Sequence, residues 1–155
     1  MNRPEIYELG FGKIIRLEED IAEVIIDNGI EMDLAMVNEY HNFLITHLKT
    51  PFSLLINKVN PYTYTFAAQR KLATIPQIRT MAVVTNNPIS EKMTLSLVRI
   101  PRDREWHIKL FRDRDLALQW LRDDRDKPRR HRATANRYNA CQSAYGKGRA
   151  RSPQR

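Results

Sequence analysis

Two apolar runs separated by a polar triplet lie near the start of the chain. Residues 11–17 and 21–27, within "FGKIIRLEEDIAEVIID", are rich in Ile and Val, and the acidic residues 18–20 lie between them. Two such runs joined by a short polar segment are typical of a β-hairpin. The preceding "IYEL" at 6–9 either adds a short strand or extends the first one across Gly10, and the pattern leaves both open.

Further along, helical spacing alternates with short apolar runs. Asp33 and Asn87 stand where each can cap a helix, and Asp113 and Asp115 suit a helix N-terminus. The elements predicted after the hairpin are a helix at 34–49, a strand at 52–59, a helix at 66–75, a strand at 78–85, a helix from Pro88 that ends before Pro101, a strand at 106–111 and a last helix containing "LALQWL".

This order of elements predicts an α/β fold. Strands that are linked by helices pair in parallel through right-handed crossovers. We therefore expect one domain over residues 1–124, with a central mixed sheet of about five strands and about four helices. The loops at 57–65, 86–88 and 111–115 would meet at the carboxyl ends of the strands, where sheets of this kind bind ligands.

Apolar stripes predict which faces of the last two helices pack inward. In the helix that begins at Pro88, the expected stripe is Ile89, Met93 and Leu97. The expected stripe of the last helix is Leu116, Ala117, Trp120 and Leu121, with Trp120 as a packing anchor.

The net charge of +8 belongs to the C-terminal tail. Residues 127–155 hold nine Lys or Arg and no Asp or Glu, which leaves 17 basic and 18 acidic side chains in residues 1–126. The same segment lacks Val, Ile, Leu, Met, Phe and Trp, so it can bury little against the entropy of ordering. We predict a disordered basic tail over residues 125–155.

A tail of this kind can contact the phosphates of nucleic acid without sequence preference. A basic tail that is merely solvated is the commoner case. The abrupt change of composition also fits a segment that is not native. Weak nucleic-acid binding is therefore expected through the tail alone. The residues that would supply it are Arg129, Arg130, Arg132 and Arg137, with Tyr138 and Tyr145 for base stacking.

The sequence holds no common motif of catalysis or phosphate binding. There is no Gly-x-Ser-x-Gly, no Gly-rich phosphate loop and no His-Glu-x-x-His. His41 and His47 fit core or boundary positions better than metal sites. We expect a non-enzymatic protein with no cofactor and no metal.

The chain shows no apolar run suited to a signal peptide, and none of the roughly 18 residues that a membrane helix needs. A cytoplasmic protein without membrane insertion is the expectation. The lone Cys141 cannot form an internal disulfide.

Residues 5–122 resemble a family. The stretches "PFSLLINKVNPYTY", "IRTMAVVTNN" and "KLFRDRDLALQWL" are similar to small bacterial proteins with the SpoIIAA-like, or STAS, fold, and "INKVN-x-Y" at 56–62 is similar to a functionally uncharacterised branch. The resemblance implies a regulatory module in which a phosphorylated serine at the start of the second helix switches partners. Thr63 and Thr65 lie at that place here, without an Asp-Ser-Ser-Gly turn, and Asn57 replaces the usual aspartate.

Thr63 and Thr65 therefore allow two interpretations. As candidate phospho-acceptors they would place negative charge at a helix N-terminus, where it is stabilised. As structural residues, Thr65 would cap the helix by accepting from the amide of Ala67 or Ala68, and Thr63 would only form part of a turn. The structural interpretation is favoured.

Three functions follow from these patterns. The first is a protein-interaction module that acts through the loop 57–65 on an unknown protein partner, with the oligomeric state, including a dimer, left open. The alternative is a small apolar-ligand or lipid-binding domain, because the resembled SpoIIAA-like superfamily is similar in topology to lipid-carrying Sec14-type domains; Tyr62, Tyr64 and Phe66 would then line an apolar mouth. The third is nucleic-acid binding by the tail. The predicted partner or ligand loop comprises Asn57, Lys58, Asn60, Tyr62, Tyr64, Asn86 and Asn87.

Overall fold

A computed structural model describes residues 3–127, which form an α/β fold with four helices and a six-stranded mixed sheet. The strand order is β1-β2-β3-β5-β7-β8, and β4 and β6 pair separately. The elements are β1 (Glu5–Leu9), β2 (Gly12–Glu18), β3 (Ile21–Ile26), β4 (Glu31–Met32), α1 (Leu34–His47), β5 (Phe52–Asn57), β6 (Thr63–Tyr64), α2 (Phe66–Lys71), β7 (Ile78–Val84), α3 (Pro88–Val98), β8 (Ile108–Phe111) and α4 (Arg114–Asp126).

The first three strands pair antiparallel, which confirms the predicted hairpin between β2 and β3. "IYEL" belongs to β1, a strand of its own, so the main sheet has six strands instead of about five. Gly12 lies where β2 passes close to β3. A Cβ at this position would come within 2.5 Å of the Ile25 carbonyl oxygen, so only glycine allows this approach.

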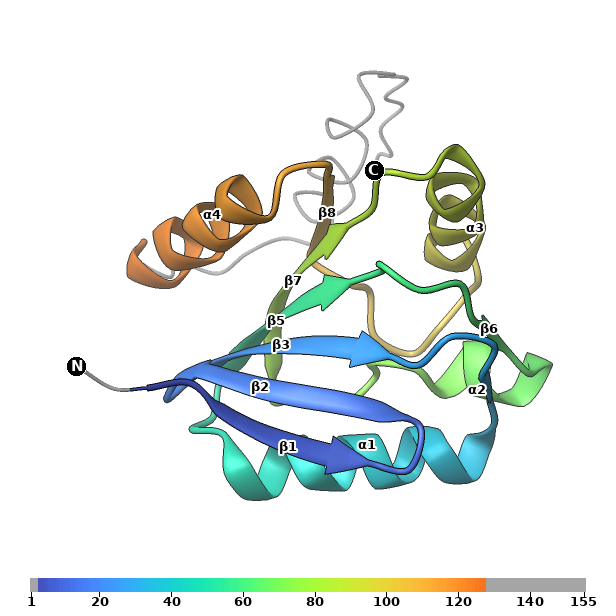
Figure 1. Ribbon diagram of the computed structural model, residues 1–155, viewed down its shortest axis with the longest axis horizontal. Helices are drawn as coiled ribbons and strands as arrows, with labels where there is room; N and C mark the ends of the chain where they lie inside the picture. The colour runs from blue at the N-terminus through green and yellow to red at the C-terminus, as the bar shows by residue number, and fades with distance from the viewer. Residues whose placement is uncertain (1–2, 128–155) are drawn as a thin grey trace.

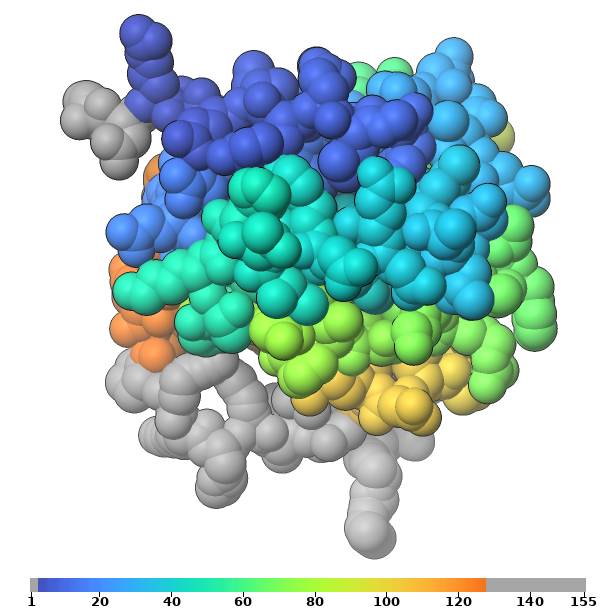
Figure 2. Space-filling view, turned by 90° about the horizontal axis from the view of Figure 1, so that it is seen from below, coloured from blue at the N-terminus to red at the C-terminus, as the bar shows by residue number. Residues whose placement is uncertain are grey.

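The remaining strands pair in parallel, as the alternation of strands and helices predicted. Figure 1 shows α1 and α2 on one side of the sheet and α4 on the other. In Figure 2, α1 lies between β1 and the segment that contains α2. Because both faces are covered, the central strand β5 begins with four consecutive buried residues.

Two apolar cores result, one on each side of the sheet. The larger lies toward α1 and α2 and contains, among others, Ile14, Val37, Leu44, Phe52, Leu54 and Met81. The smaller lies beneath α4 and consists of Ile21, Leu55, Ala82, Val84, Ala117 and Leu121. Trp120 packs against the smaller core while remaining partly exposed, so it contributes to packing as expected.

The second helix is shorter than predicted. It ends at Lys71 instead of residue 75, because Ala73 adopts a left-handed φ of 55° that a helix cannot continue through. The N–H of Ala73 donates to Nε2 of His41 at 3.0 Å. His41 is only 4% exposed, which confirms its predicted core position and gives it a role in ending α2.

The expected inward stripes of α3 and α4 are partly wrong. Ile89 is 68% exposed and Met93 42%, whereas Thr94 and Leu97 are the buried residues of α3. Figure 1 shows α3 beyond the carboxyl ends of the strands and not over a face of the sheet, and Ile89 and Met93 border an open hollow there. In α4, Leu116 is likewise 61% exposed.

Part of the predicted tail falls within the described residues, because α4 continues to Asp126. The nucleic-acid contacts predicted for Arg129, Arg130, Arg132 and Arg137 lie outside them.

Candidate functional site

The candidate site is a cleft at the carboxyl ends of β5 and β7, named here the Lys58 cleft. The chain that leaves β5 runs between α3 and β6 at this edge (Figure 1). Loop 99–107, between α3 and β8, supplies a further wall through Trp106. The floor is apolar and comes from the sheet, through Val24, Ile56, Met81, Val83 and Ile108.

Backbone and side-chain hydrogen bonds hold the loop that carries Lys58. The N–H of Lys58 donates to the Val84 carbonyl at 2.9 Å, and the side-chain amide of Asn60 donates to the Ile26 carbonyl at 3.0 Å. The chain then pairs with β4 through β6, so Thr63 lies in a short parallel strand and not in the predicted turn. These hydrogen bonds hold the loop in place independently of the side chains that line the enclosed part of the cleft.

Lys58 is the charged group of the cleft. Its Nζ lies 5.1 Å from the ring centroid of Tyr62 and 5.8 Å from that of Tyr64. Within residues 3–127 no carboxylate forms an ion pair with it. Burial lowers the pKa of Lys58 to about 8, because the ammonium loses water without gaining an anion.

Three tyrosines line the same cleft. The Tyr64 hydroxyl donates to the Tyr62 hydroxyl at 3.3 Å, and Tyr40 is only 4% exposed. Burial raises the pKa of Tyr64 to about 12 and also raises the pKa values of Tyr40 and Tyr62. The phenols therefore stay protonated at neutral pH, and the Tyr62 hydroxyl, which accepts from Tyr64, can donate its own proton to a ligand oxygen.

Arg102 stabilises one wall of the cleft. Its guanidinium lies 3.8 Å from the ring centroid of Trp106 and donates to the carbonyls of Gln69 and Leu97, each at 2.7 Å. These carbonyls belong to the ends of α2 and α3. Burial lowers the pKa of Arg102 to about 10. Arg102 thus fastens loop 99–107 to two helices, and its donors are used within the protein.

The cleft is unfilled. It encloses about 40 Å³ of free space and adjoins two more open hollows of about 370 and 360 Å³. Lys58 and Tyr62 line all three spaces, so they lie where the enclosed part meets the open parts. Apolar walls with a few polar groups are typical of a small-molecule site, but the enclosed part is small, so the body of a ligand would also occupy the open hollows.

Several residues predicted from the sequence are brought together here. Lys58, Tyr62 and Tyr64 line the enclosed part, whereas Asn60 borders one of the open hollows and Thr63 borders both. Asn87 borders the same hollow as Asn60, but its Oδ1 accepts from the amides of Ile89 and Ser90 and so caps α3 as expected.

Other predicted residues lie elsewhere. The side chain of Asn57 donates to Glu23 at 2.8 Å, and Glu23 in turn binds Arg114 of α4, so Asn57 serves the opposite face of the sheet. Asn86 is exposed. Phe66 is 74% exposed, and the expectation that it lines an apolar mouth is therefore wrong: as the first residue of α2 it points outward.

Sequence reasoning missed Tyr40, Arg102 and Trp106. Tyr40 comes from α1 and the other two from the loop before β8, so no local pattern links them to Lys58. The sequence carries only a weak local signal for Arg102 and Trp106, namely a Trp that follows an Arg by four residues in a charged loop.

Thr65 is a helix cap, and its removal should destabilise the fold. Its Oγ1 accepts from the Ala68 amide at 3.2 Å. We expect T65A to lower the free energy of unfolding by about 1 kcal/mol. T65S keeps the hydroxyl, and serine caps at least as well as threonine, so its free energy of unfolding should stay within about 0.5 kcal/mol of the parent value. Urea denaturation followed by circular dichroism measures both. Equal stability of T65A and the parent chain would show that the cap contributes nothing.

Phosphorylation of Thr63 or Thr65 stays a prediction.

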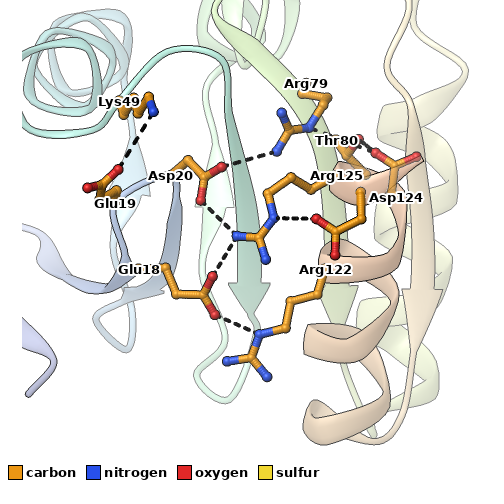
Figure 3. Close-up of polar contacts among 10 residues, drawn as sticks. Glu18, Glu19, Asp20, Lys49, Arg79, Thr80, Arg122, Asp124 and Arg125 are labelled. Atoms are coloured by element: carbon orange, nitrogen blue, oxygen red, sulfur yellow. Dashed lines mark hydrogen bonds and ion pairs between the residues drawn. The ribbon is translucent and has the colours of Figure 1, made fainter. Parts of the chain in front are cut away.

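A second polar cluster lies on the other face of the sheet (Figure 3). Arg125 donates to Glu18 at 2.6 Å and to Asp20 at 3.0 Å, and Arg122 donates to Glu18 at 2.6 Å. These contacts tie α4 to the turn between β2 and β3. Here each cation faces a carboxylate, in contrast to Lys58, so we assign this cluster to stability.

Among residues 3–127, no group of three His, Cys, Asp or Glu side chains could hold a metal ion. In the same part of the chain, the helices are all too short or too polar to cross a bilayer. Neither a family model, nor a curated protein, nor a solved structure matches the chain. A function must therefore be argued from the geometry.

Proposed function

We propose that the protein binds a small, largely apolar molecule that carries one acidic group, and that Lys58 holds this group in the cleft. The observation that carries the proposal is the Lys58 ammonium, which lies among apolar and aromatic side chains without an ion-pair partner in residues 3–127. The apolar floor would receive the body of the ligand.

The energetics favour an anion at this place. A cation that has lost water and gained no counter-ion is destabilising, and a carboxylate within reach would reverse that cost. The neutral phenol of Tyr62, which accepts from Tyr64, adds a donor that a carboxylate oxygen can accept from. A cationic ligand would find no negatively charged partner among the side chains of Lys58, Tyr62 and Tyr64.

This proposal favours the ligand-binding alternative over the interaction module, because the cleft beside the tyrosines is unfilled. A protein partner at the loop 57–65 stays a prediction. The α/β architecture is compatible with the SpoIIAA-like family that the sequence resembles, and membership of that family also stays a prediction.

Octanoate and octanol separate the charge from the apolar body. Isothermal titration of the full chain near neutral pH should show that octanoate binds about tenfold more tightly than octanol, because only octanoate pairs with Lys58. Octanoate affinity should fall as the pH rises past the Lys58 pKa of about 8, since the ammonium is then lost.

The variant K58M tests the assignment. It should remove the preference for octanoate while leaving octanol binding in place, and its free energy of unfolding should be unchanged or higher. K49M is the matched control, because the Lys49 side chain is 71% exposed and lines neither the cleft nor the two hollows. Equal loss in both variants, or octanoate binding that K58M retains, would contradict the proposal.

A further inference from the structure

We propose that Lys58 is also a nucleophile, and that its amine captures aliphatic aldehydes in the cleft as a reversible imine. This rests on the ligand-binding function proposed above and adds a second class of ligand to the same cleft. The aldehyde would place its chain on the apolar floor and its carbonyl carbon at Nζ.

Access and environment at Nζ fit this role. Lys58 lines both the enclosed space and the two open hollows, so a ligand can enter and water can leave beside the amine. The backbone of Lys58 is fixed by its hydrogen bond to Val84 at the end of β5. Within the described residues no carboxylate holds the amine in its charged form.

Desolvation also supplies the neutral amine that the reaction needs. With a pKa of about 8 for Lys58, roughly a fifth of the side chain is neutral near pH 7.4, against about one part in a thousand for an ordinary lysine. Lysines that are desolvated in apolar sites are nucleophiles in this way.

The chemistry balances without another reactant. The nitrogen lone pair of Lys58 forms a bond to the carbonyl carbon, and the C=O π pair moves to the oxygen. Proton transfer from nitrogen to that oxygen gives a carbinolamine. The C–O bond then breaks, water leaves, and nitrogen forms the C=N bond as it loses its remaining proton. Hydrolysis by the reverse path releases the aldehyde.

Other lysines provide internal controls in the same chain. Lys49 is solvent-exposed and lies 3.8 Å from Glu19, and Lys13 is partly exposed on β2. Neither lines the cleft. Any simple reaction of aldehydes with accessible amines would modify these lysines as readily as Lys58.

The experiment traps the imine on the full chain with octanal and cyanoborohydride near neutral pH, followed by peptide mapping. We expect Lys58 to be alkylated about tenfold faster than Lys13 or Lys49. Octanoate added in excess should slow the modification of Lys58 alone. In K58R, which keeps the charge but not the reactive amine, the cleft should stay unmodified and the other lysines should react as before.

The outcomes separate the two proposals. If octanoate binds as expected but Lys58 reacts no faster than the exposed lysines, the nucleophile is refuted and the ligand-binding function stands. If octanoate does not bind and Lys58 is also unreactive, both fail. Selective modification that octanoate does not slow would refute the shared cleft. The competition requires no variant, so poor folding of K58R would not affect it.

Discussion

The variant D124A is expected to lose about 3–5 kcal/mol of unfolding free energy, because it breaks a buried polar cluster. Asp124 is 7% exposed and accepts hydrogen bonds from Thr80 and, at 3.1 Å, from Nε2 of His107. It also lies 4.0 Å from Nε of Arg79, whose side chain is 8% exposed. Removing the carboxylate takes away one of the two anions beside the buried Arg79 guanidinium and leaves Asp20, at 3.6 Å.

The fold places Arg79 in this cluster through an irregularity in β7. Ile78 pairs with Phe52 and Thr80 with Ser53, so Arg79 is an extra residue that forms a bulge. A bulge can turn two consecutive side chains toward the same side, and here Arg79 and Thr80 both reach Asp124 of α4 (Figure 3). The Asp124 carboxylate therefore contacts β7 at the bulge, where the regular pairing of β5 with β7 is interrupted.

Neighbouring and compensating variants make this test specific. D123A alters the adjacent but exposed carboxylate, which accepts a hydrogen bond from Gln119 at 3.0 Å, and should change stability by less than about 0.5 kcal/mol. Adding R79M to D124A should recover part of the loss, since it removes a buried guanidinium that has lost one of its two carboxylates. Urea denaturation gives all four values. A loss in D124A no larger than in D123A would show that the cluster does not stabilise the fold.

Local features of the fold could be predicted from the sequence because they depend on neighbouring residues. Asp33, Asn87 and Asp113 each accept an amide two or three positions ahead, so the starts of three helices follow from short stretches. The apolar runs of β5 and β7 likewise report burial directly. Such features need no knowledge of the rest of the chain.

The features that the sequence did not predict depend on residues that are far apart in the chain. The early end of α2 requires His41, which lies 32 positions before Ala73. The role of Lys58 depends on which carboxylates are already engaged: Glu23 pairs with Arg114, 91 positions away, on the opposite face of the sheet. The sequence predicts that Lys58 lies in a loop. That it has no ion-pair partner among residues 3–127 is seen only once the positions of the charged side chains in the fold are known.

Acid is expected to destabilise the protein through His41 between about pH 6.5 and pH 4. Nε2 of His41 accepts from the Ala73 amide, so the folded state requires the neutral ring. Burial, together with a smaller effect of the Lys71 charge, lowers the pKa of His41 to about 4. The unfolded chain takes up this proton near its ordinary pKa of about 6.5. Stability is therefore complete above that pH and is lost as the pH falls through the folded value, by roughly 3 kcal/mol in all.

The variant H41Q isolates this contribution. A glutamine amide oxygen can accept from Ala73 but does not titrate, so H41Q should lose most of the pH slope between about pH 6.5 and 4.5 whatever its stability at neutral pH. H47Q makes the same change on the same helix at a residue whose ring stacks on Phe43 at 4.0 Å. Urea midpoints measured over this range compare the slopes, and carboxylates that titrate in all three chains cancel. If the pH slope of H41Q equals the slopes of the parent and of H47Q, a group other than His41 causes the acid destabilisation. The conclusion holds because glutamine cannot take up a proton in this pH range.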